Sequence, residues 1–421
     1  MKNIVKFTVF LTVFVLAAGC KSQPAATDSS QQVRDIFAGV ANVFILKGDL
    51  SLWGVGYNRS DQLGLGENQA GNSGDVSIVR IDDITGAPFS GVLSVAAGEN
   101  HTVILKDDGT LWGAGDSTDG ELGQSGGRLK IFVPLKAGTT PITGVKAVAA
   151  GNNTTFYVDK DGSLWAAGYN YYGELGLGNR NAQFTFTKVN SAGQNVKALA
   201  AGMRHTVLLK EDGTLWAAGY NFNGQLALGD SEDRNSFTEV KDAGSGITAV
   251  AAGNYHTVIL KSDGSVWTAG SNYYGQLGFA GKADRQTFTR VTDEKGNTLS
   301  GVKEIAARGN ITVLLKADGS MLLTGNFTDP DGMNEPAAAA AAPDSGASGG
   351  INPNDTKSSF TPLVTEDGSK FGDVKKIVLG YNSIYVIASD GRLWAAGSNR
   401  YGQLSLGLDT EASSALKLIN P

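Results

Sequence analysis

One stretch of the chain, residues 196–229, is repeated along most of its length. It begins with the apolar run VKALAAG and continues with HTVLLK, whose polar and apolar residues alternate as in a half-buried strand. The EDG sequence that follows is typical of a tight hairpin turn, and TLWAAG supplies a strand that pairs back across it. The loop YNFNGQLALG and another apolar run, SFTEV, complete the unit. Each unit therefore predicts four short strands.

The number of copies sets the architecture. Residues 149–178 and 250–278 repeat the unit closely, and looser copies occupy residues 38–66, 95–123, 305–325 and 377–407, which makes seven. A tryptophan recurs in the TLWAAG-type strand, although Leu322 takes its place in the sixth copy. A single small sheet cannot bury both of its faces, whereas sheets arranged around an axis bury each other. The sequence predicts an all-β, seven-bladed β-propeller over residues 33–421.

The strand order within a blade is predicted from the two ends of the propeller. We count the SFTEV-type strand as the first of each blade and TLWAAG as the fourth. The first copy then lacks its first strand, and residues 415–419 follow the seventh copy without a partner. We therefore expect the N- and C-terminal strands to pair in one shared blade, which would close the ring and leave no strand edge exposed.

These residues resemble the RCC1 repeat family. The matching segments are HTVILKDDGTLWGAG (101–115), HTVLLKEDGTLWAAG (205–219) and HTVILKSDGSVWTAG (256–270), together with loops such as NYYGELGLG (170–178) and NYYGQLG (272–278). The resemblance covers residues 33–421 and implies a seven-bladed propeller. The family includes a guanine-nucleotide exchange factor and many binding modules, so the fold alone does not select a function.

The N-terminus resembles a bacterial lipoprotein signal peptide. Residues 1–19 contain Lys2 and Lys6 followed by an apolar run that is too short for a confident membrane span, and they end in LAAG before Cys20. We expect Cys20 to be lipidated and residues 20–32, rich in Ser, Gln and Ala, to form a flexible tether. This predicts a lipoprotein of the bacterial cell envelope, which contacts the membrane through its lipid anchor only.

Charge and motifs exclude several classes of function. The formal net charge of −6 becomes −8 once Lys2 and Lys6 are removed, and no Lys/Arg run is present, so we expect no nucleic-acid partner. No serine is linked in the sequence to a histidine and an acid, and no phosphate-binding loop is present. We therefore expect no enzymatic activity, no cofactor and no metal site.

One unit carries a long insertion. In the sixth copy residues 326–359 replace the usual loop and contain six consecutive alanines flanked by Pro336 and Pro343. The prolines limit any helix there to one or two turns, which is marginal in water. We predict a low-complexity surface insert that the fold tolerates.

Aromatic residues gather on one face of the predicted ring. Alternate connections in an antiparallel blade lie on the same face, so the Gly-x-x-His turn and the long loop should lie together, opposite the Asp-Gly hairpin. At one loop position the third, fourth and fifth blades have Tyr171, Phe222 and Tyr273, where other blades have arginine or threonine. With Tyr255, His205 and His256 they form our candidate binding patch, since aromatics are enriched at binding hot spots. Local packing of the aromatics, and histidines bonded to a turn backbone, are the structural alternatives.

Together these features predict a monomeric, lipid-anchored scaffold without enzymatic activity that binds a protein or peptide partner. A carbohydrate-binding module of the cell envelope is the alternative, with the aromatic rings stacking on sugars. Guanine-nucleotide exchange is a third alternative, by family analogy only.

Overall fold

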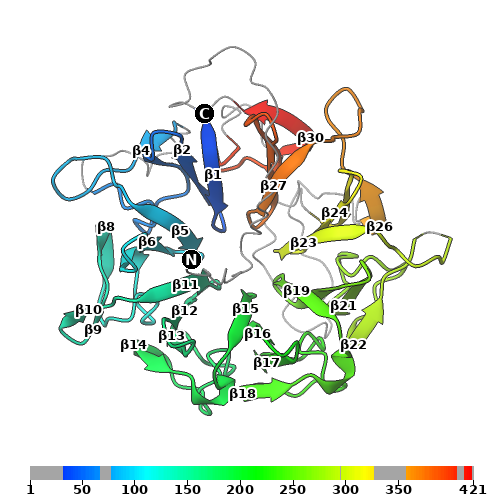
Figure 1. The fold of residues 1–421 in the computed structure, drawn as a ribbon, viewed down its shortest axis with the longest axis horizontal. Coiled ribbons are helices and arrows are strands. Elements are labelled where there is room, and N and C mark those ends of the chain that lie inside the picture. Colours follow the sequence, from blue (N-terminus) through cyan, green and yellow to red (C-terminus); the bar gives the residue numbers. More distant parts are fainter. Residues whose placement is uncertain (1–31, 67–76, 294, 327–356, 405–411, 420–421) are drawn as a thin grey trace, which may run out of the picture.

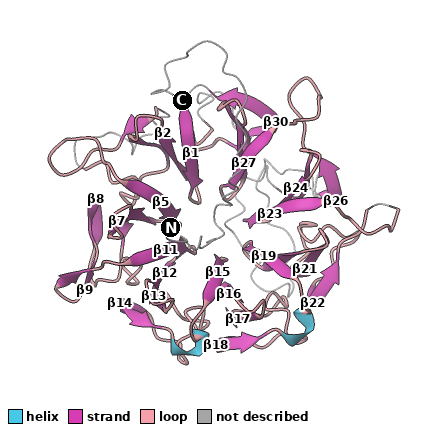
Figure 2. Cartoon of the chain, viewed as in Figure 1, coloured by secondary structure: helices cyan, strands magenta, loops and turns pink. Residues whose placement is uncertain are grey.

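The computed structural model describes residues 32–66, 77–293, 295–326, 357–404 and 412–419. Their strands form seven four-stranded antiparallel sheets and one two-stranded ribbon. The sheets stand as blades around a central axis in chain order (Figure 1). Among the described residues the helical segments are two 3₁₀ turns, η1 (Asn190–Ala192) and η2 (Lys241–Ala243) (Figure 2). The predicted all-β, seven-bladed propeller is confirmed.

The first four blades have the following strands. Blade 1 contains β1 (Val33–Ala38), β2 (Asn42–Lys47), β3 (Leu52–Gly56) and β4 (Val79–Arg80). Blade 2 contains β5 (Val92–Ala97), β6 (His101–Lys106), β7 (Leu111–Asp116) and β8 (Arg128–Pro134), followed by the ribbon of β9 (Lys136–Ala137) and β10 (Thr140–Pro141). Blade 3 contains β11 (Val145–Ala150), β12 (Thr154–Asp159), β13 (Leu164–Gly168) and β14 (Gln183–Lys188). Blade 4 contains β15 (Val196–Ala201), β16 (His205–Lys210), β17 (Leu215–Gly219) and β18 (Arg234–Glu239).

The other three blades continue the same order. Blade 5 contains β19 (Ile247–Ala252), β20 (His256–Lys261), β21 (Val266–Gly270) and β22 (Arg285–Arg290). Blade 6 contains β23 (Val302–Arg308), β24 (Ile311–Lys316), β25 (Met321–Gly325) and β26 (Lys357–Pro362). Blade 7 contains β27 (Val374–Leu379), β28 (Ser383–Ala388), β29 (Leu393–Ser398) and β30 (Ala412–Ile419).

The strand order within a blade differs from the prediction. In each blade the VKALAA-type strand lies nearest the axis, and the SFTEV-type strand is the outermost strand of its own unit (Figure 1). In blade 4, for example, Trp216 of β17 pairs with Glu239 of β18. Each blade is therefore one contiguous stretch of chain, and its outer strand does not belong to the following unit.

The loop after the third strand explains this order. In blade 4 the side-chain nitrogen of Asn221 donates to the backbone oxygen of Asp230 over 3.0 Å, and its side-chain oxygen accepts from the backbone N–H of Leu226 over 2.9 Å. These bonds fold the loop back on itself, so that the chain re-enters the sheet beside the strand that it left. Asn170 and Asn272 make equivalent bonds in blades 3 and 5.

The ring is closed without a shared blade. β30 pairs with β29 in blade 7 and β1 pairs with β2 in blade 1, so the expected pairing of the N- and C-terminal strands is wrong. The two blades instead pack face to face through buried side chains such as Ile36 and Tyr385. The backbone N–H of Tyr381 also donates to the oxygen of Val40 over 3.2 Å. Hydrophobic packing between sheets, rather than strand pairing, joins the two ends of the ring.

The core is divided among the interfaces between blades. Seven buried clusters occupy the seven interfaces, and each combines side chains from the facing sheets of two neighbouring blades. The recurring tryptophan is partly buried against the cluster shared with the preceding blade, as Trp216 is at the interface of blades 3 and 4. The repeat thus encodes its own interface, because each copy buries the same residues against the next.

The insert predicted at residues 326–359 is shorter at its C-terminal end. β26 begins at Lys357, which pairs with Gly325, so the last three predicted insert residues belong to the outer strand of blade 6. Residues 327–356 lie outside the described residues, as do the predicted signal peptide, Cys20 and all but the last residue of the tether. Within the part of the chain that the structure describes, no helix is long and apolar enough to cross a membrane.

Candidate functional site

The Gly-x-x-His turns and the long loops lie on the same face of the ring, as predicted. Within each of several blades, the residue after the third strand donates a backbone hydrogen bond to the turn between the first two strands. The backbone N–H of Tyr220 donates to the oxygen of Arg204 over 2.8 Å, and that of Ser271 donates to the oxygen of Tyr255 over 2.7 Å. The Asp-Gly hairpins connect the opposite ends of the same strands, so they lie on the other face.

The histidines do not belong to an accessible patch. His205 and His256 have exposed fractions of 1% and 0%, so the prediction that they contribute to a binding surface is wrong. Nε2 of His205 lies 3.1 Å from the hydroxyl oxygen of Thr257 in blade 5, and Nε2 of His256 lies 2.9 Å from that of Thr312 in blade 6. The partner is thus a side chain of the next blade rather than the turn backbone, and the contact joins two sheets.

The hydrogen bonds of the threonine fix the tautomer of the histidine. The hydroxyl of Thr257 donates to the backbone oxygen of Gln225 over 2.7 Å, so its single proton is already used. Its oxygen must therefore accept a proton from Nε2 of His205, which is consequently the protonated nitrogen of a neutral ring. Burial lowers the pKa of His205 from 6.5 to about 4 and that of His256 to about 3. Both rings are uncharged at neutral pH and act as interblade contacts.

The three aromatic residues of the predicted patch are exposed. Tyr171, Phe222 and Tyr273 have exposed fractions of 61%, 58% and 48%, respectively. Large aromatic side chains are usually buried, because fully burying one removes much apolar surface from water. Local packing between neighbouring turns, the structural alternative, therefore leaves about half of each of these side chains uncovered.

Two of these residues belong to a continuous aromatic cluster that crosses three blades. Tyr171 contacts Tyr172 edge-on with ring centroids 5.1 Å apart, and Tyr172 contacts Tyr220 of blade 4 at 4.8 Å. Tyr220 in turn lies 6.3 Å from Phe222 with nearly parallel rings, and 5.9 Å from Tyr255 of blade 5. Aromatic contacts in this range are mutually attractive, so the rings support one another in place.

Tyr273 is separate from this cluster. The ring of Tyr273 contacts that of Tyr274 at a centroid distance of 4.9 Å, and the ammonium of Lys282 lies 5.0 Å from the centroid of the Tyr273 ring. No ring contact links it to the other aromatics among the described residues. The structure therefore brings Tyr171, Phe222 and Tyr255 together and leaves Tyr273 as a second exposed site on the loop of blade 5.

The sequence analysis missed two residues of the cluster, which lie in the turn before His205. The guanidinium of Arg204 lies over the ring of Tyr172, 5.0 Å from its centroid, and donates to its hydroxyl oxygen over 3.2 Å. The hydroxyl of Tyr255 contacts the sulfur of Met203 over 3.0 Å. The signal was present, since no other copy has the Met-Arg pair before this position. It became meaningful only when the fold placed the turn beside the aromatic loop.

Metal binding finds no support in the described part of the chain. No group of three or more His, Cys, Asp or Glu side chains there could hold a metal ion. The buried acids Glu121 and Glu174 are single groups in successive blades, and burial raises the pKa of each to about 7. They lie in the loops that follow the third strands of blades 2 and 3.

These features define a propeller of sequence repeats, in which histidine–threonine contacts join some of the blades and aromatic side chains lie on one face. The family model of the RCC1-like domain matches residues 68–333, and that of the regulator of chromosome condensation (RCC1) repeat matches residues 374–403. The chain belongs to the RCC1-like domain family.

Relatives share this region of the sequence. The chain is similar to the ultraviolet-B receptor UVR8 of Arabidopsis thaliana, with 30% identity over 304 residues that cover 70% of this chain and 65% of the plant protein. It is 27% identical over 324 residues to the mouse regulator of chromosome condensation, covering 71% of this chain and 74% of the mouse protein. The match to the plant receptor thus spans less than two thirds of that protein.

Solved structures support the fold. The Saccharomyces cerevisiae protein Prp20p has a TM-score of 0.66 at 18% identity, covering 93% of this chain and 88% of the yeast chain. Human WBSCR16 has a TM-score of 0.66 at 18% identity, covering 87% of this chain and 93% of the human chain. At this identity the similarity shows the propeller architecture alone.

Proposed function

We propose that this protein is a non-enzymatic scaffold that binds a protein or peptide partner through the aromatic cluster of blades 3 to 5. The observation that carries the proposal is the exposure of Tyr171 and Phe222, whose rings contact the partly buried rings of Tyr172 and Tyr220. Exposed aromatics offer a large contact area with little loss of side-chain entropy. Arg204 adds positive charge beside the ring of Tyr172, and Lys282 adds it beside the separate ring of Tyr273, which favours a partner segment that combines apolar and acidic side chains.

Related proteins are consistent with this proposal. The yeast propeller Prp20p is described by its binding to Gsp1p and histones, both of which are proteins. The N-terminal sequence supports the proposed location of the scaffold, since the LAAG-Cys20 motif resembles a bacterial lipoprotein motif. We infer that the propeller is tethered by lipid to a bacterial envelope membrane and that it is a monomer.

The test exchanges Tyr171 and Phe222 for serine together in the mature, full-length protein. Partners captured from the cell's own envelope are crosslinked and compared between wild type and variant. We expect the variant to lose a partner that the wild type retains. The matched control exchanges exposed apolar residues elsewhere, Ile84 and Phe184, for serine, and it should retain that partner. Equal capture by all three proteins would contradict the proposed site.

A second arm separates protein from carbohydrate partners. If the captured material survives protease but disappears after glycosidase treatment, the carbohydrate-binding alternative holds. Anchoring is tested independently by Cys20→Ala, which should release the protein from membranes or block its processing. A Cys20→Ala variant that fractionates with membranes like the wild type would contradict the lipid anchor.

A further inference from the structure

Four blades share one arrangement around the recurring tryptophan. In blade 4 the ammonium of Lys210 lies 4.3 Å from the centroid of the Trp216 ring, and the indole N–H donates to the hydroxyl of Thr214 over 3.0 Å. In blade 5 Lys261 lies 4.6 Å from Trp267, whose N–H donates to Ser265 over 3.1 Å. Blades 1 and 2 repeat both contacts. The repeat thus contains a cation on one side of the indole and a hydroxyl at its N–H.

Blade 6 keeps these partners but has no indole. Lys316 and Leu322 occupy the strand positions of Lys210 and Trp216, because both pairs have the same register. The hydroxyl of Ser320 donates to Asp318 over 2.6 Å, as that of Thr214 donates to Asp212 over 2.7 Å. Among the described residues, no N–H donor contacts the hydroxyl oxygen of Ser320.

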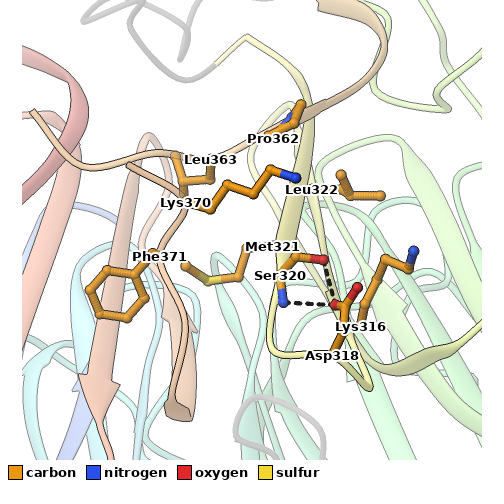
Figure 3. A pocket seen from close by; sticks show the side chains of 9 residues that line it. All are labelled: Lys316, Asp318, Ser320, Met321, Leu322, Pro362, Leu363, Lys370 and Phe371. Carbon is orange, nitrogen blue, oxygen red and sulfur yellow. Dashed lines mark hydrogen bonds between the residues drawn. The ribbon is translucent and has the colours of Figure 1, made fainter. Parts of the chain in front are cut away.

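A cavity of about 190 Å³ is lined by these residues of blade 6 and by apolar side chains that pack toward blade 7. Its lining residues come from the β24–β25 hairpin, β26 and the segment before β27: Lys316, Asp318, Ser320, Met321, Leu322, Pro362, Leu363, Lys370 and Phe371. Figure 3 shows the side chain of Lys370 extending toward Leu322 on one side of the cavity, with Lys316 on the other. Met321 and Leu363 are almost completely buried, so the apolar wall is rigid while the lysines lie nearer solvent.

The charge of the cavity favours an anion. Two lysines and one carboxylate line it. The hydrogen bond from Ser320 is the main cause that holds the pKa of Asp318 below its usual value, and the charges of Lys316 and Lys370 act in the same direction. Neither lysine has a carboxylate within ion-pair distance in the described part of the chain. Both ammonium groups are therefore available to a ligand.

We propose that this cavity binds an indole ring that carries an anionic substituent. The ring would lie beside Lys316 as the indoles of the other blades do, its N–H would donate to Ser320, and its carboxylate would face Lys370. The ring could belong to a small molecule or to a tryptophan beside an acidic residue of a partner. The site lies at the hairpin end of blade 6, on the face opposite the aromatic cluster, so it is independent of the proposed scaffold function.

Titration of the full-length mature protein with indole-3-propionate, followed by ligand-observed NMR, tests the proposal. Tryptamine, which has the same ring with a positive charge, should bind about tenfold more weakly. 1-Methylindole-3-propionate lacks the N–H donor and should bind about fivefold more weakly. Ser320→Ala should abolish only the preference for the unmethylated ring. A peptide with a Trp-Asp pair distinguishes a small-molecule ligand from a partner protein. It competes with indole-3-propionate only if the cavity admits a tryptophan that is part of a polypeptide.

Leu322→Trp is the decisive variant, because it supplies the missing indole from within the chain. We expect it to fold, to raise the melting temperature and to lose binding of indole-3-propionate. Trp216→Leu is the matched converse, which should create a second binding site beside Lys210 and Thr214. Because Trp216→Leu risks unfolding blade 4, the conclusion rests on Leu322→Trp. Absence of binding to the wild type at millimolar ligand, or equal binding by Leu322→Trp, would overturn the proposal.

Discussion

Two interfaces of the ring, between blades 4 and 5 and between blades 7 and 1, are joined by different chemistry. At the first, the neutral side chains of His205 and Thr257 form a buried hydrogen bond. At the second, Lys376 of β27 forms a buried ion pair with Asp35 of β1, and its ammonium also lies 5.0 Å from the ring centroid of Phe37. Both interfaces bury a hydrophobic cluster, so the difference lies in the polar contact.

One position of the inner strand shows the same contrast. Blades 4 and 5 have the alanines Ala198 and Ala249 there, whereas blades 6, 7 and 1 have Glu304, Lys376 and Asp35 in succession around the axis. Burial lowers the pKa of Lys376, and the charge of Asp35 opposes this effect. Burial also raises the pKa of Glu304 to about 7.

A partly buried arginine belongs to the same side of the ring. Arg308 of blade 6 stands where blade 4 has Gly202, and its guanidinium donates to the backbone oxygens of Ala38 and Ala97 over 3.3 and 2.9 Å. It therefore links blade 6 directly to blades 1 and 2 across the axis. The regular blades therefore repeat one neutral histidine–threonine contact. The blades near the two ends of the chain instead use buried charges, those of Glu304, Lys376 and Asp35, that are not repeated in the other blades.

The largest expected effect comes from breaking the ion pair at the closing interface. Lys376→Met leaves Asp35 buried without its partner and should lower the free energy of unfolding by about 3–5 kcal/mol in urea denaturation. Asp35→Leu should cost less, because Glu304 still attracts Lys376. The double variant should recover most of the loss, since it removes both charges. A double variant as unstable as Lys376→Met would show that the pair is not the source of the effect.

Breaking the neutral contact should have a smaller effect. Thr257→Val keeps the shape of the side chain but leaves the Nε2 proton of His205 and the oxygen of Gln225 unpaired, at a cost of about 1–3 kcal/mol. Thr287→Val, at an exposed position of β22, is the control and should change stability by less than about 0.5 kcal/mol. Similar losses for the two variants would mean that the interblade hydrogen bond contributes nothing specific.

The pH dependence separates the two interfaces further. Because the pKa of His205 is about 4 in the folded protein and 6.5 ordinarily, the unfolded chain binds more protons between these values. The stability that His205 contributes is therefore complete above pH 6.5 and is lost as the pH falls toward 4. We expect the stability difference between wild type and His205→Gln to shrink by on the order of 1–2 kcal/mol from pH 7.5 to pH 5.

Buried glutamates give stability the opposite pH dependence from His205. The contribution of each group is therefore measured as the difference between wild type and a variant that lacks it. The folded pKa of Glu304 is about 7, above its ordinary value of 4.5, so its contribution to stability is present below pH 4.5 and is lost as the pH rises through 7. Glu304→Gln removes this loss. The stability of the variant relative to wild type should therefore be greater at pH 8 than at pH 5, as measured by urea denaturation at the two values. If the stability difference between Glu304→Gln and wild type does not change with pH, the carboxyl is not shifted.

The smallest effect on stability is expected at the aromatic face. Exchange of Tyr171, Phe222 and Tyr273 for serine removes side chains that are about half exposed, so each should cost well below the ~3–5 kcal/mol of a buried aromatic. Thermal unfolding checks this. A large drop in melting temperature would identify these residues as structural and would contradict the proposed binding face.

The sequence by itself determined the features that depend on neighbouring residues. Strands, Asp-Gly hairpins, the number of blades and the face shared by turns and loops follow from alternation and turn chemistry, which repeat with each copy. The exposure of Tyr171 and Phe222 was also predictable, because their position varies between aromatic and polar residues among the copies.

Only the tertiary structure decided which elements meet across the ring. The outer strand belongs to its own blade because Asn221 folds the loop back, a bond between residues nine positions apart that no strand pattern reveals. His205 meets Thr257, and Lys376 meets Asp35, through packing of separate sheets. The cavity beside Leu322 likewise depends on side chains from three segments. Periodicity specifies which residues a blade buries, whereas the partner of each buried polar group is set by contacts between distant parts of the chain.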